Sequence, residues 1–307
     1  METILDKLRA ESTPEKNYLE EAIKKLDSFG QPLLHVAIEN DHSKIVHLLL
    51  DKYQADKELE DLRSGNLPVH VAAKHCSINS FDVLKEHDAV SFKANNNLDS
   101  ALHLAAANLN GFKFIGELIA YEKKMRQAEP NRDSTTVANR EPYLINALNK
   151  NNYTPLFIAI ASDHLRCVQE LLKADNLDLD AKDANENTMY HICAQFNTVE
   201  CLRHLLIKKN AKLVEPLFHK NSSDDTVIHV ACQHGHIEIV KLFIMKLSES
   251  IASMESFLTL KNKDGYNGFH IACIKGFYNI VEYFLKDLKL VSLLKSLDND
   301  ANTCLHL

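Results

Sequence analysis

Short apolar clusters recur along the chain at nearly regular intervals, each centred on one residue with apolar neighbours. The centres are His35, His70, His103, Phe157, His191, His229, His270 and His306. Subtracting successive positions gives intervals of 35, 33, 54, 34, 38, 41 and 36 residues. Five of these seven intervals are close to one period, which predicts an array of similar units with a core spread along its axis.

Between the centres, apolar residues follow the spacing of one helical face. Ile45, Val46 and Leu49 predict an inward-facing stripe on a helix from Ser43 to Asp51. A second helix is predicted from Pro32 to Asn40, on the other side of a short polar connection. Each unit is therefore expected to contribute apolar residues from more than one helix.

Residues 1–26 precede the first unit and carry two apolar stripes of their own. The stripes consist of Ile4, Leu5 and Leu8, and of Leu19, Ala22, Ile23 and Leu26. Ser12 and Glu15 have the capping-box spacing that begins a helix. Because the end of a stacked array exposes half a core, we expect an N-terminal helical cap here, with no chemistry of its own.

The longest interval, 54 residues, exceeds a period of about 33 by roughly 21 residues and predicts an insertion around residues 121–145. Tyr121 to Gln127 predict a continuation of the preceding helix, which Pro130 would end. Asn131 to Pro142 is polar and predicts a mobile loop. The interval of 41 residues predicts a longer second helix within Ile244 to Leu258.

The stretch Thr154-Pro155-Leu156-Phe157-Ile158-Ala159 is one letter from Thr-Pro-Leu-His-x-Ala, the signature of the ankyrin repeat. Because related versions recur in register, the chain resembles ankyrin-repeat proteins over roughly residues 27–307. The resemblance implies an all-α ankyrin-repeat solenoid: stacked helix pairs with short β-turn fingers, in about seven repeats plus the start of an eighth. The chain ends early in that repeat, so we expect the natural protein to continue past Leu307.

The sequence departs from the family pattern at several positions. Gly30 and Gly65 occupy the place of the family's turn glycine, which needs positive φ. That glycine is missing at Leu98, Asn152, Glu186 and Asp224, and Phe157 replaces the central histidine of the fourth repeat. We expect these departures to affect repeat boundaries and to leave the fold unchanged.

The central histidines resemble the family's structural histidines, which tie the turn to the helix and to the next repeat. A group needed once per layer is structural, and this interpretation outweighs a catalytic or metal-binding one. His234 and His236 are two residues apart without an acidic partner at helical spacing, which argues against a metal site. Nucleophile, zinc-protease and phosphate-loop motifs are absent. We therefore expect no enzyme activity, no cofactor and no metal in this segment.

Composition narrows the choice of partner. The 35 basic and 42 acidic residues give a net charge of −7, which argues against nucleic acid and against an anionic membrane surface. No apolar run is long enough for a membrane-spanning helix. The seven cysteines are scattered and are interpreted as reduced core residues, which predicts a cytoplasmic protein. We expect a monomer that binds another protein.

The resemblance implies that the partner lies against the concave face, formed by the turn tips and the exposed side of each first helix. The candidate contact residues are Phe29, Arg63, Lys74, Tyr153, Phe196, Gln233, His234 and Tyr266, together with Arg126, Arg132 and Arg140 in the insertion. Aromatic residues and arginines are the usual hot spots of interfaces. The alternatives are that each ring packs on its own repeat, and that the insertion is a tolerated loop expansion.

The sequence thus predicts a non-catalytic protein-interaction scaffold or adaptor. Its richness in Asn, Lys and Ile resembles ankyrin-repeat effectors of intracellular bacteria, which would place it in the host-cell cytoplasm after secretion. Two alternatives stay open. The segment could be the targeting module of a larger enzyme, or the cytosolic domain of a membrane channel, with the further domain beyond residue 307.

Overall fold

The computed structural model describes residue 23 and residues 25–128, 144–208, 215–247, 251–286, 291–304 and 306. In these ranges the regular elements are helices, and β structure is limited to two isolated bridges, Leu26 with Pro32 and Leu297 with Thr303. The predicted all-α class is confirmed. Most of the expected cap, residues 1–26, lies outside the described residues, as does most of the insertion.

The repeats consist of paired helices. The first helices are α3 (Leu33–Glu39), α5 (Pro68–His75), α7 (Ala101–Ala106), α9 (Pro155–Ala161), α11 (Met189–Phe196), α13 (Val227–His234) and α16 (Gly268–Ile274). The second helices are α4 (Ser43–Asp51), α6 (Ile78–Glu86), α8 (Phe112–Ala128), α10 (Leu165–Leu171), α12 (Val199–Lys208), α14 (Ile237–Leu247) and α17 (Tyr278–Lys286). Shorter elements are η2 (Leu144–Asn146), η3 (Glu215–Phe218), α15 (Ile251–Leu258) and α18 (Val291–Leu294).

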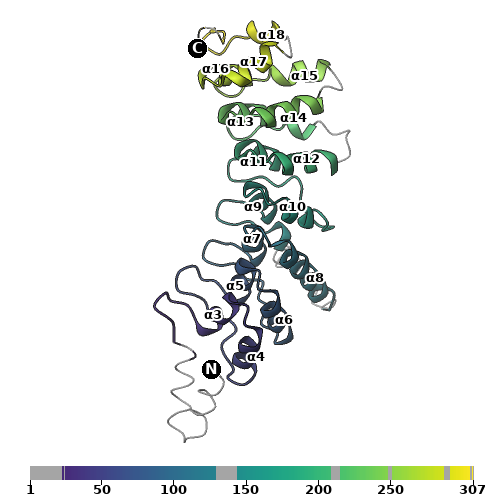
Figure 1. The fold of residues 1–307 in the computed structure, drawn as a ribbon. Coiled ribbons are helices and arrows are strands. Elements are labelled where there is room, and N and C mark those ends of the chain that lie inside the picture. Colours follow the sequence, from purple (N-terminus) through teal and green to yellow (C-terminus); the bar gives the residue numbers. More distant parts are fainter. Residues whose placement is uncertain are drawn as a thin grey trace, which may run out of the picture. The chain divides into compact units, whose positions relative to one another are not determined.

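The chain forms two compact units, residues 1–150 with 169–177, and residues 151–168 with 178–307. In the first unit α3, α5 and α7 stack in one row, with α4, α6 and α8 beside them (Figure 1). In the second unit α9, α11, α13 and α16 form one row, and α12, α14 and α17 form the row beside it (Figure 1). Each unit therefore has a core that runs along its rows.

Aromatic and small apolar side chains fill the core between the two rows. Phe81 of α6 and Phe114 of α8 are fully buried, with ring centroids 4.6 Å apart. Ala72 and Ala105, two residues after their central histidines, are also fully buried, so neighbouring first helices can approach closely. Burial of one such stripe per helix stabilises the stack, because a single repeat cannot cover its own apolar face.

A turn precedes each first helix, and we call it a finger. Fingers one to eight are residues 27–32, 61–67, 95–100, 149–154, 183–188, 221–226, 262–267 and 298–303. In each finger the residue five positions before the repeat centre has positive φ, for example 78° at Gly30 and 63° at Gly65. Leu98, Glu186 and Asp224 adopt the same conformation without glycine, at 59–60°. The missing glycines therefore leave the turns unchanged, as expected, at a cost in local strain.

Two predictions about the long intervals have different outcomes. α8 continues through Tyr121 to Ala128, which confirms the predicted extension of the third repeat's second helix. The prediction of one longer helix within Ile244 to Leu258 stays a prediction, because α14 covers the chain up to Leu247, α15 begins at Ile251, and residues 248–250 lie outside the described residues.

Candidate protein-interaction site

Central histidines join the fingers to the helices that follow them. The backbone N–H of Thr226 donates to His229 Nδ1 at 3.0 Å, and the Thr226 hydroxyl lies 2.8 Å from the same nitrogen. His191 makes the same two contacts with Thr188, at 3.2 and 2.9 Å. Because Nδ1 accepts a backbone hydrogen bond, the proton of the neutral ring is on Nε2.

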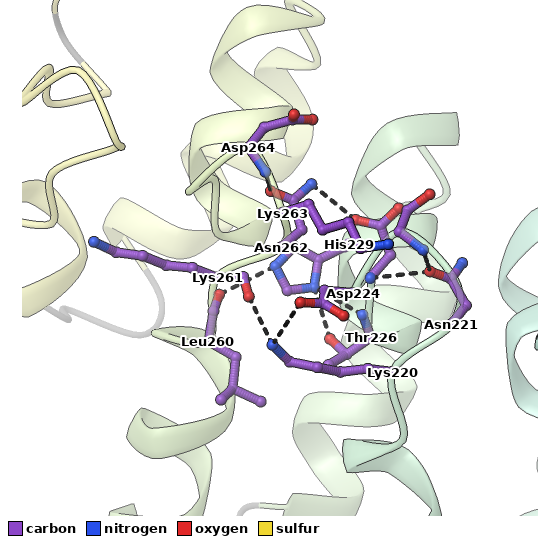
Figure 2. Close-up of polar contacts among 12 residues, drawn as sticks. Lys220, Asn221, Asp224, Thr226, His229, Leu260, Lys261, Asn262, Lys263 and Asp264 are labelled. Carbon is purple, nitrogen blue, oxygen red and sulfur yellow. Dashed lines mark hydrogen bonds and ion pairs between the residues drawn. The ribbon is translucent and has the colours of Figure 1, made fainter.

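The second ring nitrogen reaches the next repeat. His229 Nε2 donates to the carbonyl oxygens of Leu260, at 3.1 Å, and Tyr266, at 3.0 Å. His191 Nε2 donates to the Asp225 carbonyl at 3.1 Å. Figure 2 shows His229 between the segments 220–226 and 260–264. The predicted structural role of the histidines, tying turn to helix and repeat to repeat, is confirmed for these residues.

Burial keeps these rings neutral. The pKa of His35, His70, His191 and His229 is lowered from 6.5 to about 4, chiefly because burial penalises the charged form. For His229 the hydrogen bonds to two carbonyl oxygens oppose this shift and only partly offset it. Neutral, buried rings such as those of His191 and His229, which have hydrogen bonds at both nitrogens, hold structure and offer no free base for catalysis.

Lysines on the fingers also link neighbouring repeats. Lys220 Nζ donates to the Lys261 carbonyl at 3.0 Å and lies 3.9 Å from Asp224, as Figure 2 shows. Lys263 Nζ donates to the Ser222 carbonyl. These amines satisfy backbone acceptors and carboxylates of the array itself. They do not form the continuous basic face that phosphate neutralisation needs.

The tips of fingers one and two carry an exposed apolar and cationic cluster. The Phe29 side chain is 59% exposed, and Leu62 is 73% exposed. The Arg63 guanidinium lies 5.3 Å from the centroid of the Phe29 ring, a cation–π distance. Fingers one and two are joined here, because the Leu62 N–H donates to the Gly30 carbonyl at 3.1 Å. Within the described ranges no carboxylate forms an ion pair with Arg63.

Side chains at the C-terminal ends of the first helices are also free for contact. Lys74 of α5, Gln233 and His234 of α13 are exposed. Phe196 of α11 and Ile274 of α16 are each 44% exposed. The last two are apolar side chains at the C-terminal ends of the first helices of the fifth and seventh repeats, on either side of α13 in sequence order. Sequence reasoning selected Phe196 but left Ile274 out of the final set, although it follows its repeat centre by four residues.

The two predicted tyrosines are engaged with their own repeats. Tyr153 is half-buried and its ring lies edge-on to Phe157, with centroids 6.0 Å apart. The Tyr266 ring lies 6.1 Å from His270, and its carbonyl accepts from His229. Burial raises the pKa of the Tyr153 hydroxyl. Both rings therefore contribute to packing within the array, which leaves Phe29 and Phe196 as the most exposed predicted aromatics.

Arg126 forms part of a buried anchor at the base of the insertion. The carboxylate of Glu122, 3% exposed, accepts from Arg126 Nε at 3.0 Å and Nη2 at 2.8 Å. The same oxygen accepts from the Leu144 N–H at 3.1 Å, so it joins both ends of the insertion. Sequence reasoning missed Glu122, although its spacing of four residues from Arg126 on one helix was visible. Arg132 and Arg140 lie outside the described residues.

A groove of about 490 Å³ runs between α8 and residues 170–176. Its charged groups pair with one another: Lys123 lies 3.5 Å from Asp175, and Lys173 lies 2.5 Å from Glu170. Arg126 is held by Glu122 as described above. Because these charges compensate one another locally, the groove has no excess of either sign to select a charged ligand.

The remaining candidate groups are possible metal ligands and cysteine nucleophiles. In the part of the chain that the structure describes, no three His, Cys, Asp or Glu side chains are arranged to hold a metal ion. The seven cysteines, all within the described ranges, form no disulfide, and Cys167, Cys193, Cys201 and Cys232 are fully buried. Burial raises the pKa of Cys193 to about 12, so this thiol is not an available nucleophile. Among the described helices, none has the length and apolar character to cross a membrane.

Comparison with known families agrees with this geometry. The family described as ankyrin repeats (3 copies) matches residues 34–132, 136–215 and 209–292. The chain belongs to the ankyrin-repeat family. Membership confirms the resemblance drawn from the hexamers and places the chain among modules that commonly serve protein interaction and are typically not catalytic.

Several known proteins are similar to the chain at low identity. An NAD-dependent deacetylase sir2B of Dictyostelium discoideum is 21% identical over 288 residues, which cover 88% of this chain and 35% of that protein. The ankyrin repeat-containing protein ITN1 of Arabidopsis thaliana is 27% identical, over 48% of this chain and 21% of that protein. A transient receptor potential cation channel subfamily A member 1 homolog of Caenorhabditis elegans is 25% identical, over 73% of this chain and 16% of that protein. The chain thus spans about a third or less of each relative's length.

Proposed function

We propose that this segment is a non-catalytic adaptor, which binds a partner protein through the finger tips and the exposed ends of its first helices. The observation that carries the proposal is the cluster of Phe29, Leu62 and Arg63. It holds two apolar side chains more than half exposed and a guanidinium stacked on the ring. Exposed aromatic and arginine side chains on a rigid scaffold are the residues that dominate binding energy at interfaces.

The second unit supports the same function with a second contact area. Phe196 and Ile274 are apolar side chains at the exposed ends of α11 and α16, and Gln233 and His234 lie on α13 between those helices in sequence order. Burial lowers the pKa of His234, with further contributions from His236 and Lys275. A neutral His234 lets this area accept an apolar partner surface without burying a charge.

A second candidate function follows from the relatives. The chain covers 35% of a deacetylase and 16% of a channel homolog, as their names describe them. We propose as the alternative that the adaptor is one part of such a longer protein and brings a catalytic or channel domain to the partner. In this proposal the insertion at residues 121–145 adds to recognition, since repeat insertions often carry binding.

Paired substitutions at the finger tips test the adaptor proposal. Phe29→Ala with Arg63→Ala is expected to weaken binding of a specific partner by roughly 30-fold, as loss of one hot spot of about 2 kcal/mol would do. Lys44→Ala, an exposed residue on α4, is the matched control and should leave binding unchanged. Quantitative affinity capture with crosslinking, followed by titration of each recovered protein, gives the measurement.

Thermal unfolding of all variants separates lost binding from lost folding. Exposed side chains contribute little to stability, so the midpoints should stay within a few degrees of the parent. Equal affinity of every recovered partner for the parent, the finger-tip variant and a Phe196→Ala variant would contradict the proposal.

A further inference from the structure

Three kinds of hydrogen bond connect one finger to the next, and the joint between fingers six and seven has all of them. Asn262 Nδ2 donates to Asp225 Oδ1 at 2.9 Å. The Lys263 backbone N–H donates to the Ser223 carbonyl at 3.2 Å. The His229 ring donates to two carbonyls of the next repeat, as described above. A side-chain amide, a backbone amide and a histidine thus act together.

The joint between fingers five and six repeats this set. Asn221 Nδ2 donates to Asn187 Oδ1 at 2.8 Å, and the Ser222 N–H donates to the Asn185 carbonyl at 2.9 Å. His191 supplies the ring donor, to the Asp225 carbonyl. The donor in the side-chain link is always the first residue of the finger. It must therefore be asparagine, because an aspartate carboxylate has no N–H to donate.

Other joints carry some of these links. The side-chain links are Asn95 to Asn66 and Asn149 to Asp99, both at 2.9 Å. The backbone links are Leu62 N–H to the Gly30 carbonyl at 3.1 Å, Asn96 N–H to Ser64 at 2.9 Å and Lys150 N–H to Asn97 at 3.0 Å, and His270 donates to the Ser296 carbonyl at 3.0 Å. Fingers two, five and eight begin with aspartate and so lack the side-chain link. In fingers two and eight a backbone or histidine donor remains.

The joint between fingers four and five lacks all three links. Phe157 stands at the centre of the fourth repeat and has no ring nitrogen. Asp183, at the start of finger five, cannot donate, and its oxygens accept from Asn185 N–H and Asn187 N–H within the same finger, both at 2.8 Å. In the described ranges the Ala184 N–H makes no bond to finger four, where Ser222 and Lys263 make theirs.

Helix packing remains at this joint. Phe157 is 2% exposed, Leu156 is 1% exposed, and α9 packs against α11. We propose that the fingers of this array separate at the joint between fingers four and five, where finger five can move from finger four while α9 and α11 stay packed. Separation would uncover the half-buried ring of Tyr153. The proposal adds a place of movement and does not depend on the identity of any partner.

Equivalent turn amides provide matched probes in three fingers. Glu186 N–H donates to the Asp183 carbonyl at 3.0 Å, Asp224 N–H to Asn221 at 2.9 Å, and Gly265 N–H to Asn262 at 3.0 Å. Amide hydrogen exchange of the full chain, corrected for intrinsic rates and followed by NMR or mass spectrometry, compares them. The Glu186 amide is expected to exchange at least about tenfold faster than the other two, because its finger has the fewest links to its neighbour.

Two sets of substitutions test whether the missing links cause the faster amide exchange in finger five. Phe157→His, Tyr153→Asn and Asp183→Asn together copy the joint between fingers five and six, and should slow exchange in finger five toward that of finger six. His229→Phe, Asp225→Tyr and Asn262→Asp copy the weak joint into the six–seven position, and should accelerate exchange at Gly265 by about tenfold. The second set introduces the residue types found at the folded joint between fingers four and five, so it still tests the proposal if the first variant does not fold.

The outcomes decide the proposal. The proposal is supported if the Glu186 amide exchanges faster in the parent chain and if either substitution set changes the exchange rate in the expected direction. Equal exchange at Glu186, Asp224 and Gly265 in the parent chain would overturn it. So would fast exchange at Glu186 that neither folded variant set reproduces or removes, because the missing links would then not be its cause.

Discussion

Acidification from about pH 7 to about pH 4.5 is expected to destabilise the folded array by several kcal/mol and to unfold it before carboxylates protonate fully. Four buried histidines have their pKa lowered from 6.5 to about 4 by burial. In the unfolded chain these rings regain the ordinary value. Between the two values the unfolded state binds more protons than the folded state, so acid favours unfolding.

The sign and the pH window follow from that difference. Stability from these histidines is complete above pH 6.5 and falls as the pH drops toward about 4. A shift of this size corresponds to roughly 3 kcal/mol for each ring, so four rings together rival the total stability of an ordinary domain. Burial raises the pKa of Asp225, which acts in the opposite direction and offsets part of the loss.

Urea titrations at several pH values between about 4.5 and about 7.5 measure the effect. A His229→Phe variant is the control, because Phe157 shows that a phenylalanine fits the equivalent position of this chain. That variant should be less stable at neutral pH but should depend less steeply on pH, since one titrating ring has been removed. A urea midpoint independent of pH above about 5 would contradict the assignment of neutral buried rings.

The repeat pattern predicted the fold because one structural requirement recurs at each layer. The central histidines were visible in the sequence, and the hydrogen bonds of His191 and His229 confirm what their recurrence implied. The continuation of α8 from Tyr121 through Gln127 could likewise be predicted from helical spacing.

The exposure of individual side chains was less predictable than the fold. Tyr153 and Tyr266 occupy positions that often face a partner, yet their rings pack on Phe157 and His270. Exposure depends on the neighbouring repeat, which a position count within one repeat does not contain. Arg126 shows the same limit, since its charge is matched by the buried Glu122 at the preceding helical turn.

Links between fingers were hidden for a related reason. Asparagine and aspartate both make the same turn within a finger, so a single-repeat pattern treats them as equivalent. They differ in whether they can donate to the preceding finger, as Asn262 does to Asp225. This difference matters only where two successive fingers lie next to each other in the structure, which a pattern within one repeat does not show.

Replacement of His229 by alanine is expected to lower the free energy of unfolding by about 3 kcal/mol. The ring is fully buried, accepts from the Thr226 N–H and donates to the carbonyls of Leu260 and Tyr266. Alanine leaves these three backbone groups without their partner and leaves a cavity where the ring was. Both effects act at the junction of two repeats, so the loss should extend to the stack beyond it.

His234→Ala is the matched control, because this second histidine lies five residues further along the same helix and is exposed. Its removal should change the urea midpoint by no more than about 0.5 kcal/mol in equivalent stability. Far-ultraviolet circular dichroism followed through urea titration at neutral pH measures both variants under identical conditions. Similar midpoints for His229→Ala, His234→Ala and the parent chain would show that the central histidine is not the structural link that its three contacts indicate.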